Sequence, residues 1–146
     1  MSLYQGPDAI QHDGPASVLL GSHGPATSAI EAPSSINYLA VRLKEGESWR
    51  YDPPADHTVC WVALSTGSLA VPEPVQAGEL AVFEKSNEAI DFDAETNTEF
   101  VLGSAASHPY ELALGYYSVH TSPASLQAGE RRLAEIKARL QKDGRL

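Results

Sequence analysis

The chain has 146 residues, of which 42% are hydrophobic and 20% are charged. This composition is typical of one globular domain with its own core, and it excludes a disordered protein. The formal net charge of -9, with no Lys/Arg patch to offset it, would repel a phosphate backbone, so we expect no nucleic-acid partner.

The single cysteine, Cys60, excludes an internal disulfide framework and is typical of a reducing compartment. No apolar run approaches the length that spans a membrane. The N-terminus shows neither the basic region nor the apolar core of a secretory signal. The sequence therefore predicts a cytoplasmic, acidic domain without a membrane partner.

Residues 1–33 predict an N-terminal arm or linker. Gly-Pro pairs at residues 6–7, 14–15 and 24–25 break the chain repeatedly, and only residues 17–20 can form a short strand between them. We expect this segment to be an arm laid over a domain, or a linker from a preceding one.

Residues 34–121 predict a β-rich domain. Apolar and polar residues alternate from Ile36 to Lys44, as in a half-buried strand, whereas residues 58–64 form a nearly continuous apolar run, typical of a strand buried on both faces. Further strands are expected at residues 68–71, 80–83, 90–93, 100–102 and 112–116, with a loop at 72–74. Short strands separated by frequent turn signals predict a β-sandwich or barrel.

One amphipathic helix closes the chain over residues 122–146. Ser122 can accept an orphan backbone N–H at the N-cap, Pro123 suits the first helical position, and Asp143-Gly144 is a stop signal. The apolar residues at 126, 133, 136 and 140 share one helical face. We expect that face to pack on the chain's own β-domain, in preference to serving as a partner-binding element.

Three segments resemble the C-terminal cupin domain of pirin-like proteins. Residues 38–46 (YLAVRLKEG) resemble the strand and turn that open that domain, and residues 76–83 (QAGELAVF) resemble its mid-barrel strand. Residues 115–121 and the helix after them resemble the family's joint and closing helix, with Tyr116-Tyr117 in place of Pro-Phe and His120 in place of Asn. The resemblance covers about Ile36 to the end and implies a cupin-type, RmlC-like β-barrel with a C-terminal helix, in a divergent subgroup.

Pirin-like proteins are similar to bicupins, which carry two barrels in one chain and usually hold a metal in the N-terminal one. The resemblance implies that this chain corresponds to the second barrel only. Metal-binding cupins use an H-x-H-(x)3–4-E cluster and a further His on a later strand, because alternate residues of a strand point into the barrel together.

About where those ligands would stand, this chain has Pro53, Ala55 and Val59, with Asp91 on the later strand. None of them supplies an imidazole. The resemblance therefore implies that the metal site is lost and that this chain holds no metal or other cofactor. Iron or another divalent metal would belong to the family's N-terminal domain.

Other candidate ligands are weaker. His57 lies beside the expected cluster, but we expect it in a loop or turn, and a separation of three residues along a strand would place it and Cys60 on opposite faces. His12, His23, His108 and His120 show no ligand spacing.

Asp91, Asp93 and Glu95 form a carboxylate row that suits a hard cation, although a solvated strand face is the simpler interpretation. Cys60 lies in an apolar strand, where a thiol is usually inert.

Four aromatic residues are candidates for a ligand pocket or for the core: Trp49, Trp61, Tyr116 and Tyr117. The sequence leaves open whether His57 or the last three of these line a pocket. It names no catalytic residue, so we expect no enzymatic activity from this chain by itself. By the family resemblance, any dioxygenase-type activity would reside with the N-terminal barrel.

Two functions remain open. The first is a metal-free cupin domain that serves as the structural or regulatory partner of a metal-binding N-terminal cupin. Without that partner, its uncovered apolar surface would lead to self-association as a homodimer. The arm 1–33 is the segment expected to cover this surface or to be exchanged between subunits. The second is a small-molecule-binding or quercetinase-type dioxygenase cupin acting on flavonoid-like or other aromatic substrates. Metal content separates them, because a dioxygenase mechanism needs a redox metal.

Overall fold

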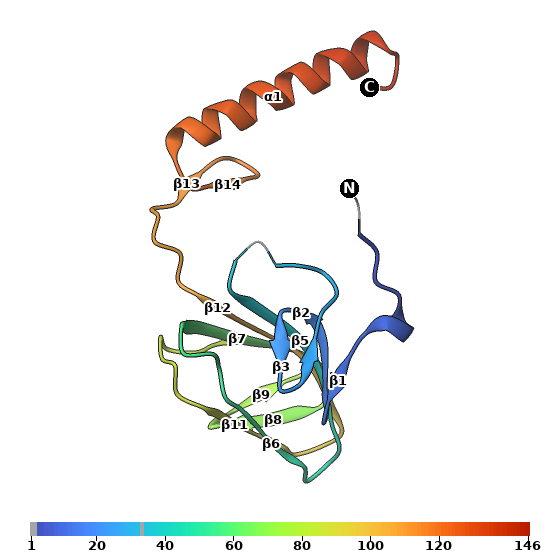
Figure 1. The fold of residues 1–146 in the computed structure, drawn as a ribbon, viewed down its shortest axis with the longest axis vertical. Helices are drawn as coiled ribbons and strands as arrows, with labels where there is room; N and C mark the ends of the chain where they lie inside the picture. The colour runs from blue at the N-terminus through green and yellow to red at the C-terminus, as the bar shows by residue number, and fades with distance from the viewer. Residues whose placement is uncertain (1–2, 33) are drawn as a thin grey trace. The chain divides into compact units, whose positions relative to one another are not determined.

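The computed structural model of the protein describes residues 3–32 and 34–146 (Figure 1). The chain forms two compact units, residues 1–107 and residues 108–146. The first unit is β-structure, and the second holds a hairpin and the single long helix.

Two antiparallel sheets enclose the core of the first unit. The larger sheet has the order β1 (His12–Asp13), β2 (Ala16–Leu20), β5 (Ile36–Leu43), β12 (Thr98–Ala106), β7 (His57–Thr66), β10 (Leu80–Val82). The smaller sheet has the order β6 (Ser48–Tyr51), β11 (Ile90–Ala94), β8 (Ser68–Val71), β9 (Glu73–Gln76). The short helix η1 (Pro7–Ala9) and a hairpin of β3 (Ser22–His23) and β4 (Ala26–Thr27) complete the unit. The predicted mainly-β class is confirmed, in the form of a sandwich rather than a closed barrel.

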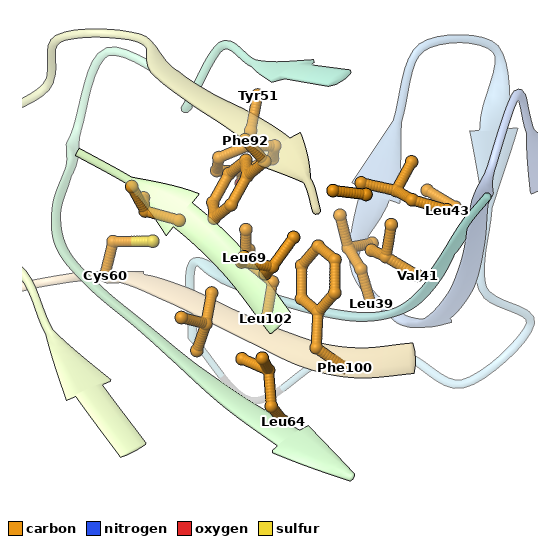
Figure 2. Packing of buried hydrophobic residues seen from close by; sticks show 14 of the residues in the cluster. Leu39, Val41, Leu43, Tyr51, Cys60, Leu64, Leu69, Phe92, Phe100 and Leu102 are labelled. Atoms are coloured by element: carbon orange, nitrogen blue, oxygen red, sulfur yellow. The ribbon is translucent and has the colours of Figure 1, made fainter. Parts of the chain in front are cut away.

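The core forms because the long strands alternate as predicted. On β5 the side chains of Leu39, Val41 and Leu43 are buried, and the facing sheet contributes Phe92 (Figure 2). Phe92 stacks on Phe100 of β12 with ring centroids 5.4 Å apart. Each fully buried side chain of this size contributes roughly 1.5–3 kcal/mol of transfer free energy.

Strand β7 differs from the prediction of a strand buried on both faces. Cys60, Val62 and Leu64 are buried, but Trp61 and Ala63, which point the other way, remain partly exposed. The smaller sheet covers the inner face of β7, and no second layer of the first unit covers the outer face in the part of the chain that the structure describes.

The segment expected as a loose arm is part of the larger sheet. Strand β2 pairs with β5, and its Ala16 and Val18 are completely buried. Residues 1, 2 and 33 of that segment lie outside the described residues. Gly14-Pro15 and Gly24-Pro25 form turns between short strands, and Gly6-Pro7 begins η1. The short strand expected at residues 17–20 is confirmed as part of β2, but it belongs to the larger sheet and is not part of a loose arm.

Two strands of the smaller sheet were not predicted. Strand β6 lies between a turn and the Pro53-Pro54 break, and β9 replaces the loop expected at residues 72–74. Pro74 pairs with Ala70 of β8. An edge strand tolerates proline because one side of its backbone has no hydrogen-bond partner to lose.

The second unit holds β13 (Ala113–Leu114), β14 (Val119–His120) and α1 (Pro123–Lys142). The predicted cap is confirmed, because the Ser122 hydroxyl accepts a hydrogen bond from the Ser125 backbone N–H at 3.2 Å. No described residue of α1 is buried, and packing of its apolar face on the β-domain remains a prediction. No helix among the described residues is long and apolar enough to cross a membrane.

The strand expected at residues 112–116 was wrong. Only two residues pair, with β14, and the side chains of Leu112, Leu114 and Tyr116 are exposed. Apolar residues do alternate at positions 112, 114 and 116, but these residues belong to the second unit and join neither the six-stranded nor the four-stranded sheet.

Two glycines at turns give a matched test of packing at the edge of the core. Gly67 and Gly78 both have a positive φ, +82° and +87° respectively. They differ in the space around them: a Cβ at Gly67 would overlap the Thr98 hydroxyl and the Asn97 carbonyl, whereas a Cβ at Gly78 would meet nothing within 4 Å. Alanine at either site costs about 1–2 kcal/mol from the left-handed backbone. We expect Gly67→Ala to lower the free energy of unfolding by roughly 1–3 kcal/mol more than Gly78→Ala, measured by chemical denaturation. Equal losses would contradict the contact.

Candidate functional site

The buried core contains one row of hydrogen-bonded polar side chains, centred on His57. Asn37 comes from β5, Tyr51 ends β6, His57 begins β7 and Ser104 comes from β12. All four are at most 4% exposed. Asn37 and Ser104 face each other across the β5–β12 ladder, so the sheet register itself brings the row together.

A β-bulge points His57 into the core. Along β12, Ser104 pairs with Cys60 and Ala105 with Val59, but Ala106 pairs with His57, so one residue of β7 is skipped. His57 and Cys60 are therefore both buried, at 2% and 5% exposure. The predictions of a loop histidine and of opposite faces were wrong, because a bulge breaks the two-residue period of a strand.

The hydrogen bonds of the row are short and continuous. The amide Nδ2 of Asn37 donates to the Tyr51 hydroxyl at 3.1 Å, and that hydroxyl lies 2.6 Å from Ser104 Oγ. Ser104 Oγ lies 2.7 Å from Nδ1 of His57, and Ser35 Oγ lies 2.9 Å from its Nε2. Both ring nitrogens of His57 thus have a hydroxyl partner. No buried side-chain nitrogen or oxygen lacks a hydrogen bond in residues 3–32 and 34–146.

The direction of the row follows from its fixed end. The Ser22 backbone N–H donates to Asn37 Oδ1 at 2.9 Å, which turns the amide Nδ2 toward Tyr51. Tyr51 then has its own proton free for Ser104, and Ser104 has its proton free for Nδ1 of His57. The opposite direction would leave the Tyr51 proton without an acceptor in the row.

At its other end the row reaches the surface. With Nδ1 accepting, neutral His57 carries its proton on Nε2 and donates it to Ser35 Oγ. A hydrogen bond from Ser35 is the main cause that lowers the pKa of the exposed Asp56 carboxyl. The row therefore leads from a backbone N–H through Asn37, Tyr51, Ser104 and His57 to the exposed hydroxyl of Ser35.

Burial keeps the groups in this region neutral. Desolvation lowers the pKa of His57, against a smaller opposing effect of the Asp56 charge. Desolvation also raises the pKa of Tyr51 and raises the pKa of the Cys60 thiol to about 11. At neutral pH the row holds a neutral imidazole, a phenol and hydroxyls, and Cys60 is a thiol rather than a reactive thiolate.

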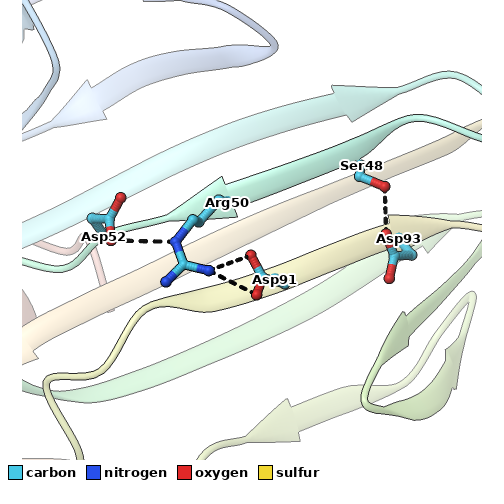
Figure 3. Close-up of polar contacts among 5 residues, drawn as sticks. All are labelled: Ser48, Arg50, Asp52, Asp91 and Asp93. Carbon is cyan, nitrogen blue, oxygen red and sulfur yellow. Dashed lines mark hydrogen bonds and ion pairs between the residues drawn. The ribbon is translucent and has the colours of Figure 1, made fainter.

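The positions matched to cupin metal ligands do not fit a metal site. Pro53, Ala55 and Val59 have no side-chain donor atom. Asp91 lies on the exposed face of β11, where both its oxygens lie 2.9 Å from Nη1 of Arg50 (Figure 3). Among the described residues, no group of three or more His, Cys, Asp or Glu side chains is arranged to hold a metal ion.

The carboxylate row expected at Asp91, Asp93 and Glu95 is divided among separate partners. Asp93 accepts a hydrogen bond from Ser48 of β6 (Figure 3). Glu95 accepts one from Ser68 of β8. Asp91 is paired with Arg50 as described above. Each carboxylate is satisfied by its own neighbour, and the three do not converge on one point.

The other histidines have local partners. His23 packs its ring against Trp49 and Tyr51, with centroids 5.4 and 5.7 Å away, and lies 3.9 Å from Asp13. His12 bonds Ser17, His120 bonds Ser118, and His108 accepts from the backbone of Tyr110. His23 is the only one of these beside the buried row.

The candidate aromatic residues have three different environments. Trp49 packs on the core, with its ring 5.5 Å from that of Phe92. Trp61 points to the outer face of the larger sheet, where it lines a shallow hollow of about 270 Å³. Tyr116 and Tyr117 are 88% and 93% exposed in the second unit.

Sequence reasoning missed Asn37, Tyr51, Ser104 and Ser35. One signal was available: Asn37 and Ser104 are two residues from Leu39 and Leu102, so the period of the strand places these polar side chains on the buried face. The partners they find there could not be read from spacing alone, because they come from four separated segments.

Comparison with known proteins places the fold. No family model matches the chain, and no curated protein matches it. Two crystal structures of quercetin 2,3-dioxygenase from Acinetobacter baumannii superpose on it, one with 18% identity and a TM-score of 0.72 and the other with 11% identity and a TM-score of 0.70. The superpositions cover 84% and 86% of this chain. The chain has a cupin-type fold.

These likenesses show the fold alone, because the identities are low. The chain spans less than half of those solved chains, 43% of each. A nickel(II) complex of the bacterial pirin YhhW from Escherichia coli also matches, at 12% identity and a TM-score of 0.49 over 54% of this chain and 34% of that one.

The neutral state of His57 predicts a pH dependence of stability. Because its pKa is lower in the folded than in the unfolded protein, the unfolded chain binds the extra proton first as pH falls below the ordinary value near 6.5. The free energy of unfolding should therefore fall with decreasing pH in that range, by at most ~1.4 kcal/mol per pH unit. In His57→Gln we expect this part of the slope to disappear. The same slope in both proteins, measured by urea denaturation, would contradict it.

Two tyrosines give a matched test of the row. Tyr51→Phe removes the hydroxyl between Asn37 and Ser104 and should lower the free energy of unfolding by roughly 1–3 kcal/mol, because buried polar atoms lose their partner. Tyr38→Phe is the control, since the Tyr38 hydroxyl makes no side-chain hydrogen bond with the described residues. If the control costs as much as Tyr51→Phe, the row does not stabilise the core.

Proposed function

We propose that this chain is a metal-free cupin domain that serves as the structural or regulatory partner of a metal-binding cupin, as the C-terminal domain of a pirin-like protein. The observation that carries the proposal is the state of His57, the one imidazole within the buried row. Both of its nitrogens are engaged by serine hydroxyls. A metal ligand needs a free lone pair, and Nδ1 of His57 uses its lone pair to accept the Ser104 proton.

The rest of the interior supports the same function. A redox metal in a cupin is held by several imidazoles and a carboxylate. Here the corresponding positions are occupied by side chains without ligand atoms or, at Asp91, by a carboxylate paired on the outside with Arg50. The space between the sheets is filled by aromatic and aliphatic side chains such as Tyr51, Phe92 and Leu102.

The pairing with another cupin is supported by length and by resemblance. The solved chains that share the fold are more than twice as long as the part that this chain matches. The three segments at residues 38–46, 76–83 and 115–121 resemble a C-terminal domain. The alternative, a dioxygenase acting on aromatic substrates, needs a redox metal, for which we find no fitting residues.

Metal content tests the proposal. The chain, produced in medium supplied with iron, nickel, copper, manganese and zinc, should contain far less than one equivalent of any of them by elemental analysis. His57→Ala should give the same low content, because the wild-type imidazole already has two partners. His108→Ala, at an exposed histidine, controls for surface binding. About one metal per wild-type chain, lost in His57→Ala and kept in His108→Ala, would refute the proposal.

A further inference from the structure

The outer face of the larger sheet carries rows of mainly apolar side chains, one of which crosses five strands. One row across the sheet has Leu20, Tyr38, Gly103, Trp61 and Val82 in register. The next has Ala40, Val101, Ala63 and Leu80, and a third has Ile36, Ala105 and Val59. Sheets whose outward positions are apolar are normally covered on both faces. Val82 and Leu80 are 68% and 61% exposed.

This outer face has a ridge between two hollows. Tyr38 and Trp61 lie on either side of Gly103 with ring centroids 6.0 Å apart, and a Cβ at Gly103 would overlap the Trp61 ring. Small side chains on one side of the ridge, including Ala40 and Ala63, line a hollow of about 300 Å³. On the other side lies the hollow of about 270 Å³. Grooves of this kind accept the side chains of a helix.

The second unit carries a surface of the matching kind. Leu126, Leu133, Ile136 and Leu140 form the apolar stripe of α1, and Leu133 is 63% exposed. The stripe is about 21 Å long at ~1.5 Å per residue. Five strands at ~4.8 Å spacing cover about 19 Å. The stripe is therefore long enough to cross the apolar face.

The two units carry formal charges of opposite sign. Residues 1–107 hold fifteen acidic and four Lys or Arg side chains, a formal charge of -11, whereas residues 108–146 hold four acidic and six basic ones, a formal charge of +2. All six basic residues lie on or just after α1. Glu79 and Glu84, which flank β10 in the sequence, are exposed. Glu99 is exposed as well and pairs with Arg42 at the hollow lined by Ala40 and Ala63. Two acidic sheet faces would repel each other, while a basic helix and an acidic sheet attract.

We propose that the outer face of the larger sheet binds α1 of a second copy of this chain. Each copy has one such face and one helix, so reciprocal docking closes a two-fold dimer in which both apolar surfaces are covered. The proposal places the apolar face of α1 on the partner's sheet, in place of the packing on its own β-domain that the sequence predicts. The ridge of Tyr38 and Trp61 and its flanking hollows receive the leucine stripe, and the basic side chains of α1 meet Glu79 and Glu84. This inference does not rest on the proposed function, which concerns the interior.

Light scattering on the full chain tests the dimer. We expect a mass of about 31 kDa, twice the 15.6 kDa of one chain. Val82→Asp on the sheet and Leu133→Glu on the helix should each shift the protein to monomer. Both residues are exposed, so both variants should fold, as circular dichroism can check. Asn87→Asp, in an exposed loop, and Ala138→Glu, on the opposite face of α1, are the charge-matched controls and should remain dimeric.

Mixing the two variants identifies which surfaces meet. Val82→Asp has an intact helix and Leu133→Glu an intact sheet face, so an equimolar mixture should recover a heterodimer through one of the two contacts. The result that overturns the proposal is a wild-type monomer up to high concentration, a Leu133→Glu protein that stays dimeric, or a mixture that stays monomeric.

Discussion

The structure depends on burying one histidine in its neutral form. His57 has no charged partner in the core, and desolvation lowers its pKa. Its burial is tolerated because Ser104 donates to one ring nitrogen and Ser35 accepts from the other. Three features meet that requirement. A bulge in β7 turns the His57 side chain into the core, Ser104 of β12 points into the core beside it, and the Tyr51 hydroxyl donates a hydrogen bond to Ser104.

The same requirement decides what the cupin interior does. An imidazole in a barrel-like site is a metal ligand when its lone pair is free, and a structural element when a hydroxyl proton occupies it. Here Asn37, held by the Ser22 backbone, sets the direction of every donor up to Nδ1. The buried polar row therefore joins the two sheets within a mainly apolar core, and it leaves no ring nitrogen of His57 without a hydrogen-bond partner.

Much of the fold could be predicted from local patterns. The alternation from Ile36 to Lys44 placed Leu39, Val41 and Leu43 correctly, and Ser122-Pro123 placed the start of α1, because these signals are local. The bulge before Cys60 could not be predicted, since it depends on pairing with β12. The short strand at residues 17–20 was predicted, but its place in the larger sheet was not, because that depends on pairing with β5. The strand at Pro74 was not predicted either, since proline is tolerated there only because β9 is an edge strand. The buried row of hydrogen-bonded side chains could not be predicted either, because its members come together only through the register of the strands.

The protonation of His57 at neutral pH is the most direct measure of this account. Nitrogen chemical shifts of the imidazole, assigned with His57→Gln, distinguish a neutral ring protonated on Nε2 from one protonated on Nδ1 and from the cation. The account predicts the neutral Nε2–H form, with shifts that do not change when nickel or zinc is added. A ring protonated on Nδ1, or one whose resonances shift or broaden stoichiometrically with metal before those of the surface histidines, would contradict it.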